Sequence, residues 1–197
     1  MEWDFDSWAE TYDDDVGRED WIHADYEEVL KLVAERVGGT VVDIGCGTGN
    51  ILCFLKCERY IGVELSRGMR AKFREKHGFE PLDGHFLKVP LPEGAADAVI
   101  STYAFHHVPD EEKGVALREM LRVLKPEGKI VIGDVMFESE GEKLKIGKED
   151  GILDEVLDEY FATVNELKEL CERLDLQCSF GRVNRYVWIA EIFPVLL

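Results

Sequence analysis

The sequence predicts an α/β fold with a mostly parallel sheet, and three observations carry this prediction. Short apolar runs typical of buried strands alternate with segments whose apolar residues recur at helical spacing. The run at residues 41–44 opens directly into a glycine-rich turn, as in parallel sheets that hold nucleotide-like ligands at their strand ends. Two closing runs, residues 177–183 and 185–192, meet at Asn184 and predict a terminal antiparallel pair.

Length and charge restrict the possible functions. A chain of 197 residues suits one domain, so we expect residues 1–197 to fold as a unit. The net charge of −18 would repel a phosphate backbone, which argues against nucleic acid as a partner. No run of about 18 apolar residues could cross a bilayer, and the acidic amino terminus does not resemble a signal peptide. We therefore expect a cytoplasmic protein with no membrane partner.

The five cysteines predict neither disulfides nor a metal centre, because none belongs to a pair of C-x-x-C motifs. Cys53 and Cys57 lie four residues apart and could share a helix face, but a metal would need further ligands beside them. We expect both to be small buried hydrophobic residues.

The first 38 residues are expected to form a lid segment and a helix. Residues 1–18 are too aromatic for a disordered tail, which indicates that they fold over another part of the molecule; the aromatic residues are Trp3, Phe5, Trp8 and Tyr12. Apolar residues then recur at helical spacing over residues 22–37, and Gly38 and Gly39 end that helix.

The turn after the first strand carries alternating glycines, Gly45, Gly47 and Gly49. A backbone without side chains can approach a bulky ligand closely there. Asn50 occupies the position of the third glycine in a dinucleotide motif, which counts against a nicotinamide cofactor. A tight turn without a ligand is the alternative, and a helix over residues 50–56 should follow in either case.

The second strand, residues 60–65, carries Glu64 at its carboxyl end, about 20 residues after the first strand. A carboxylate at that place can accept hydrogen bonds from both hydroxyl groups of a ribose. Alternatively, Glu64 is a surface residue near a helix over residues 67–77 that Ser66 caps. A third short strand, residues 81–86, comes next.

The fourth strand, residues 98–101, runs into the string STYAFHHVPD, and a helix begins after Pro109. A turn at residues 124–128 leads into a fifth strand that ends at Asp134.

The charged, glycine-punctuated residues 136–150 predict a mobile connection before the carboxyl-terminal elements. Two helices should follow: one over residues 152–161, and one that begins with a capping box formed by Thr163 and Glu166.

These motifs together resemble class I S-adenosylmethionine (SAM) dependent methyltransferases. The resemblance rests on the G-x-G-x-G turn with Glu64, the LKPEGK turn, and the strings FDSWAETYD, GHFL and STYAFHH, which look most like the YrrT-like branch of small-molecule methyltransferases. It implies a Rossmann-like fold with a seven-stranded, mostly parallel sheet, a C-terminal antiparallel hairpin and helices on both faces. Residues 39–134 would be the cofactor-binding core, and residues 135–197 the substrate-side helices and terminal strand pair.

The resemblance implies SAM as the cofactor and S-adenosylhomocysteine (SAH) as its product. Asp43 would orient the turn and the methionine amino group. Gly45 and Gly47 would approach the ligand through their backbone, while Glu64 and the adjacent Leu65 would lie against the ribose.

The other binding residues are implied in the same way. His85 and Phe86 would face the adenine, although the family usually has Asp where His85 stands, and a solvent-facing His85 is an equal alternative. Ser101 would offer its backbone carbonyl near the amino group. Tyr12 would either close over the methionine end of SAM or fasten the first helix to the core.

The implied reaction is in-line transfer of the methyl group to an O, N, S or C atom of a small-molecule acceptor. His106 would accept the acceptor's proton or orient the acceptor, and His107 would pack against the next turn, because neighbouring residues that leave a strand face different ways. A structural role for both histidines is the alternative. A non-catalytic SAM-binding module or a nicotinamide-dependent oxidoreductase are rival functions, and the sequence leaves the acceptor and the oligomeric state open.

Overall fold

The computed structural model describes residues 4–18 and 20–195, so Trp3 of the expected lid segment lies outside the described residues. Seven strands form a sheet in the order β3-β2-β1-β4-β5-β7-β6. Their bounds are β1 Thr40–Ile44, β2 Arg59–Glu64, β3 Leu82–Asp83, β4 Ala96–Thr102, β5 Leu124–Val135, β6 Leu176–Arg182 and β7 Val187–Pro194.

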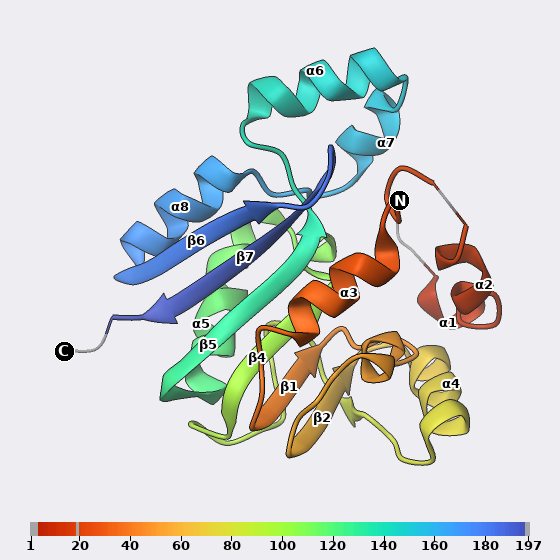
Figure 1. Cartoon of the computed structure of the whole chain (residues 1–197), viewed down its shortest axis with the longest axis vertical. Coiled ribbons are helices and arrows are strands. Elements are labelled where there is room, and N and C mark those ends of the chain that lie inside the picture. The colour runs from red at the N-terminus through yellow and green to blue at the C-terminus, as the bar shows by residue number, and fades with distance from the viewer. Residues whose placement is uncertain (1–3, 19, 196–197) are drawn as a thin grey trace.

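The first five strands pair in parallel, and β7 runs antiparallel to both β5 and β6. The expected mostly parallel sheet with a terminal antiparallel hairpin is therefore confirmed (Figure 1). The chain moves outward from β1 to β3 and then returns to the other side of β1 as β4. Such a reversal of strand order leaves a crevice at the carboxyl ends of the strands beside it.

Helices cover both faces of the sheet, with α3 on one face and α5 on the other (Figure 1). The α-helices of the described residues are α1 Phe5–Trp8, α2 Tyr12–Val16, α3 Tyr26–Ala34, α4 Arg67–His77, α5 Lys113–Val123, α6 Glu140–Asp150, α7 Leu153–Asp158 and α8 Val164–Arg173. Three short 3₁₀ helices join them: η1 Asn50–Cys53, η2 Phe105–His107 and η3 Asp110–Glu112.

The core divides into two clusters because side chains alternate across each strand. Val42 of β1 packs into the cluster that α5 and α8 cover, whereas Val41 packs into the cluster beneath α3. All four positions of β1 from Val41 to Ile44 are buried. Because both faces of this strand are buried, its residues are apolar at every buried position except Asp43.

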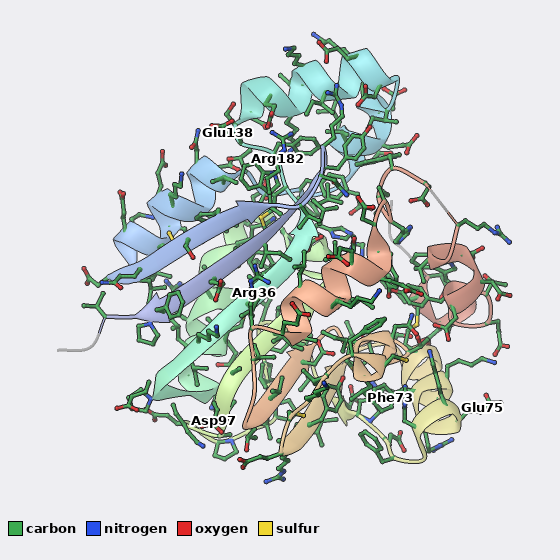
Figure 2. All side chains as sticks on the ribbon, in the orientation of Figure 1. Arg36, Phe73, Glu75, Asp97, Glu138 and Arg182 are labelled. Atoms are coloured by element: carbon green, nitrogen blue, oxygen red, sulfur yellow. The ribbon has the colours of Figure 1, made fainter. Side chains whose placement is uncertain are left out.

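Helix α4 has the bounds that the sequence predicts. Ser66 caps it by accepting a hydrogen bond from the Met69 N–H, and Gly78 ends it in the left-handed conformation at φ 78°. Phe73 points inward from this helix and Glu75 points outward (Figure 2). A Cβ at Gly49 would lie 2.5 Å from Phe73 Cε2, so this ring requires the third glycine of the turn.

The helix expected over residues 50–56 is wrong in type and length, because the structure has only η1 there. The chain returns almost at once to the start of β2, where the Glu58 and Arg59 N–H groups donate to Gly39 O. This short connection leaves room for only one helical turn between β1 and β2.

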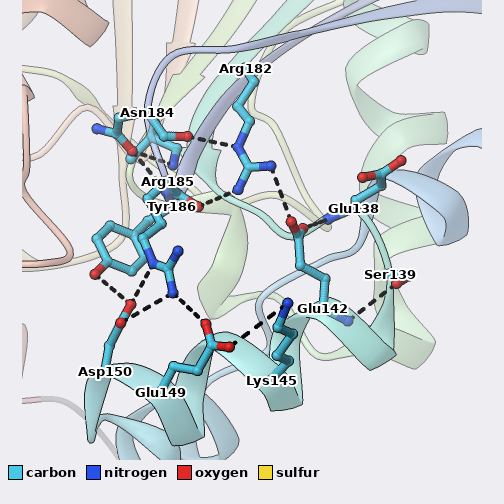
Figure 3. Close-up of polar contacts among 11 residues, drawn as sticks. Glu138, Ser139, Glu142, Lys145, Glu149, Asp150, Arg182, Asn184, Arg185 and Tyr186 are labelled. Atoms are coloured by element: carbon cyan, nitrogen blue, oxygen red, sulfur yellow. Dashed lines mark hydrogen bonds and ion pairs between the residues drawn. The ribbon is translucent and has the colours of Figure 1, made fainter.

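The mobile connection expected over residues 136–150 is also wrong, because most of it is helix α6. Ser139 caps α6, and three side chains at the β6–β7 connection bind it: Arg182, Arg185 and Tyr186, whose hydroxyl donates to Asp150 (Figure 3). Arg182 pairs with Glu142 at 3.1 Å, and Arg185 contacts both Glu149 and Asp150, at 2.9 Å and 2.7 Å. These partners lie 35 or more residues away in sequence, so local patterning could not reveal them.

Other differences concern ends of elements. Helix α7 ends at Asp158 rather than at residue 161. The helix expected over residues 22–37 is α3, which covers only Tyr26–Ala34. The expected turn at residues 124–128 is the irregular start of β5. The capping box of Thr163 and Glu166 is confirmed. No helix among the described residues is long and apolar enough to cross a membrane.

Candidate active site

A cavity of about 360 Å³ lies at the carboxyl ends of β1, β2 and β4, beside the point where the strand order reverses. Its lining includes the glycine turn after β1, the residues after β2, the loop after β3 and the turn after β4, together with part of residues 20–23 and Glu159 after α7. The amino-terminal helices α1 and α2 add the aromatic side chains of Phe5, Trp8 and Tyr12.

The glycine turn contributes backbone to the cavity wall. Gly45 has φ 73°, and a Cβ there would lie 2.5 Å from the Ala104 Cβ, so close packing against the turn after β4 requires glycine. At Gly47, with φ 53°, a Cβ would meet only the Tyr12 ring, at 3.9 Å. The Gly47 backbone therefore borders open space in which a ligand can approach it.

Glu64, at the end of β2, ties the glycine turn to the start of α4. Its Oε2 accepts from the Gly47 N–H at 2.9 Å, and its Oε1 accepts from the Ser66 N–H at 2.8 Å. Glu64 lines the cavity and is only 8% exposed, and this burial raises the pKa of its carboxyl. Each oxygen still has a lone pair that can accept from a ligand hydroxyl, which the expected binding of a ribose requires. Leu65 follows it along the wall and is 64% exposed.

Asp43 and Ser101 lie behind the wall rather than on it, since neither lines the cavity. Asp43 Oδ2 accepts from the Tyr60 hydroxyl at 2.8 Å, while its Oδ1 has no partner among the described residues. Burial raises the pKa of Asp43 to about 7. Ser101 is fully buried, and its hydroxyl also lacks a partner there.

Two carboxylates fasten the amino-terminal segment over the cavity. Asp6 Oδ1 accepts from the Ser66 hydroxyl at 2.6 Å and from the Gly68 N–H at 2.8 Å. Asp13 accepts from the Thr48 hydroxyl at 2.5 Å and from Lys76 Nζ at 2.8 Å. Tyr12 is thereby held beside the glycine turn, a position compatible with either of its expected roles.

His85 and Phe86 both line the cavity, after β3. Phe86 is buried and packs edge-on against Phe105, with 5.7 Å between the ring centroids. The Leu87 N–H donates to His85 Nδ1 at 3.4 Å, so that ring nitrogen faces its own loop.

His106 is held by Asp134, the last polar residue of β5. The His106 N–H donates to Asp134 Oδ2 at 3.0 Å, and His106 Nδ1 lies 2.6 Å from Asp134 Oδ1. Oδ1 also accepts from the Val135 N–H at 2.8 Å, so this carboxylate acts as an acceptor throughout. A carboxylate acceptor at this distance favours the tautomer of the neutral imidazole that carries its proton on Nδ1, and in that tautomer Nε2 has the lone pair.

His107 also lines the cavity, so the expectation that at most one of the two histidines faces it is wrong. Both stand on the 3₁₀ turn η2, where consecutive side chains lie about a third of a turn apart rather than on opposite sides. Their ring centroids are 4.0 Å apart. His107 Nδ1 lies 3.4 Å from Glu159 Oε2, and burial lowers the pKa of the imidazole.

Asp134, Glu159 and Glu112 are site residues that the sequence analysis did not single out. Asp134 could have been predicted from the sequence, because a carboxylate at the end of a buried parallel strand lies at the same sheet edge as Glu64. Glu159 could not, since it reaches the cavity only through the placement of α6 and α7.

One group of side chains in the described part of the chain offers donors to a metal ion, although the sequence predicts no metal. The donor atoms of His106, His107 and Glu159 lie within 4.8 Å of one another. Two histidines and a carboxylate are ligands that zinc accepts.

Sequence comparisons relate the chain to methyltransferases. The methyltransferase domain family matches residues 42–132, which span β1 to β5. An uncharacterized methyltransferase of Geobacillus sp. (strain WCH70) is 36% identical over 201 residues, covering 95% of this chain and 94% of the relative. A second, from Bacillus pumilus (strain SAFR-032), is 34% identical with the same coverage.

Solved structures have the same fold. A chain from the complex between the Haloferax volcanii Trm112 methyltransferase activator and a methyltransferase aligns with a TM-score of 0.74 at 21% identity, covering 98% of this chain and 99% of that one. The DhpI-SAM-HEP complex aligns with a TM-score of 0.72 at 22% identity, covering 96% and 94%.

Proposed function

The chain belongs to the methyltransferase family, and on that premise we propose that it transfers the methyl group of SAM to a small-molecule acceptor. The observation that carries the proposal is the junction of Glu64 with Gly47 on the cavity wall. It combines a buried carboxylate, which we assign to the ribose, with an open stretch of glycine backbone at the point where the strand order reverses.

The wall residues fit SAM. Glu64 would hold the ribose hydroxyls, Gly47 and Gly45 would face the ligand through their backbone, and Phe86 would lie against the base. SAM supplies an activated methyl group on a sulfonium. The protein's part is to align the acceptor with that methyl, an effect worth up to ~7–11 kcal/mol in well-oriented systems.

Glu64→Ala should weaken SAH binding by about 2–4 kcal/mol, because the ribose loses a charged acceptor in a partly buried site. The loss also frees the Gly47 N–H, which loosens the turn itself. Calorimetric titration with SAH measures the effect, and Glu58→Ala, at an exposed position before β2, is the matched control. Binding by a folded Glu64→Ala variant within about twofold of wild type would overturn this role.

His106 is the acceptor-side residue in this proposal. Its Nε2 lone pair can take a proton from the acceptor or orient it, while Asp134 holds the ring and stabilises the imidazolium that forms. His106→Ala should lower turnover by about two to four orders of magnitude and leave SAH affinity nearly intact. Equal turnover in variant and wild type would show that both histidines are structural.

One experiment separates this function from its rivals. The protein is titrated with SAH and with NADH, and then incubated with methyl-labelled SAM and a cell metabolite extract. Label in a small molecule supports a small-molecule methyltransferase. SAH binding without transfer would indicate a non-catalytic SAM-binding module, and NADH binding without SAH binding would indicate an oxidoreductase.

A further inference from the structure

Among the described residues, the acceptor side of the cavity carries carboxylates and no lysine or arginine. The titratable lining comprises the imidazoles of His23, His85, His106 and His107, the carboxylates of Asp20, Glu64, Glu112 and Glu159, and the phenols of Tyr12 and Tyr103. Asp20 accepts from the His23 N–H at 2.7 Å, and Glu64 serves the glycine turn. The other two carboxylates of the lining are Glu112 and Glu159, and Glu159 Oε2 lies 3.4 Å from Nδ1 of His107, the neighbour of His106.

Lys113 follows Glu112 in the chain but does not line the cavity. Lys113 Nζ donates to Val108 O at 2.7 Å, to Asp110 Oδ1 at 2.6 Å and to Tyr160 O at 2.7 Å. These three acceptors use all three of its N–H bonds. A carboxylate, phosphate or phosphonate acceptor would thus enter the cavity without a cation to pair with it.

The Glu112 carboxylate, by contrast, makes no hydrogen bond or ion pair with any described residue. His106 Nε2 likewise has no partner there, although the side chain is only 7% exposed. Both groups belong to residues that line the cavity, so each can accept a hydrogen bond from a ligand N–H there. The rings of Phe5, Trp8 and Tyr103 line the same cavity, and aromatic faces attract cations.

We propose that the methyl acceptor is an amine that enters as an ammonium ion, held by Glu112 and Glu159 beside His106. This inference rests on the proposed function and names its substrate class. The ammonium gives one proton to His106 Nε2, which frees the nitrogen lone pair. That lone pair forms the new N–C bond as the C–S bond of SAM breaks, so that SAH leaves as a neutral thioether and the product is a methylated ammonium. The proton on His106 then passes to water.

A matched set of aromatic probes tests the charge preference: benzylamine, benzyl alcohol and benzoate. Each is titrated calorimetrically into protein saturated with SAH. We expect benzylamine to bind at least about tenfold more tightly than benzoate, with benzyl alcohol between them. Benzoate binding as tightly as benzylamine would overturn the proposal.

Two charge-removing variants test the assigned residues. Glu112→Gln and Glu159→Gln keep the shape of the side chain, and each should weaken benzylamine binding by roughly tenfold while changing benzyl alcohol binding by less than about twofold. Glu111→Gln, at the exposed neighbouring position, is the control and should change neither. Unchanged benzylamine binding in both cavity variants would overturn the assignment.

The amine preference and the proposed methyl transfer can fail separately. Failure of SAH to bind wild-type protein would contradict the proposed function, whereas SAH binding without any preference for the amine would contradict the amine acceptor alone. Binding of benzylamine only in the presence of Zn²⁺ would also overturn the amine acceptor's assigned contacts, because His106, His107 and Glu159 would then be metal ligands.

Discussion

At the scale of single residues, the site depends on polar groups that folding has removed from water. Asp43 is 1% exposed and receives one hydrogen bond, from Tyr60. Glu64 receives two, from backbone N–H groups, and is nearly as buried. Burial penalises the charged form of both carboxyl groups, and it raises the pKa of Asp43 to about 7 from the usual 3.8.

Asp43 should therefore make the stability of the protein depend on pH. Its folded-state pKa is raised, so the folded protein binds the proton more tightly than the unfolded chain. The contribution of Asp43 should increase stability as pH falls from about 7 towards 4, and above pH 7 the ionised group costs free energy.

Asp43→Asn removes this titration while keeping an acceptor for the Tyr60 hydroxyl. The variant should melt a few degrees (about 2–4 °C) higher than wild type at pH 8, and this difference should shrink towards pH 5. Melting curves at both pH values measure the effect. A constant difference between the two proteins would mean that Asp43 does not titrate in this range.

At the scale of elements, one wall of the cavity depends on the helix pair α6 and α7. Glu159 follows α7, and α7 packs beside α6 rather than on the main sheet (Figure 1). Helix α6 is tied to the β6–β7 turn by Arg182 and Arg185 (Figure 3). These ion pairs are partly exposed, so each contributes at most about 1 kcal/mol to global stability.

Arg185→Ala should consequently loosen α6 and α7 more than it destabilises the whole protein. The variant loses the contacts with Glu149 and Asp150. We expect amide hydrogen exchange in residues 140–158 to become about fivefold to tenfold faster, with a change of at most about 1 kcal/mol in the free energy of unfolding. Lys148→Ala, at an exposed position on α6, is the control. Equal exchange in both variants would show that packing alone holds the helix pair.

At the scale of the whole molecule, the sequence predicts what local patterning determines and misses what distant contacts determine. The parallel sheet, the capped helix α4 and the terminal hairpin follow from apolar runs, Ser66 and Gly78, and they are confirmed. The predicted lining residues Glu64, His85, Phe86 and His106 meet at one cavity because parallel strands end at one edge, and Tyr12 joins them because Asp6 and Asp13 hold the amino-terminal segment there. Helix α6 and Glu159 were missed because Arg182 and Arg185 hold that region from far along the chain.

The net charge of −18 is also a property of the whole molecule, and it should make stability depend on salt. Excess like charge destabilises the compact state through self-repulsion, while the mostly exposed ion pairs contribute little. Raising NaCl from about 0.02 M to about 0.3 M shortens the screening length from roughly 20 Å to below 10 Å, so repulsion should weaken more than short-range pairing.

We therefore expect the melting temperature to rise by a few degrees (about 2–5 °C) over this range of salt. A triple variant, Glu58→Lys, Glu169→Lys and Glu172→Lys, changes exposed positions and reduces the net charge from −18 to −12, so its rise should be smaller. Scanning calorimetry of both proteins measures the effect. A fall in melting temperature with salt would mean that the surface ion pairs outweigh the repulsion, because screening would then remove more attraction than it relieves.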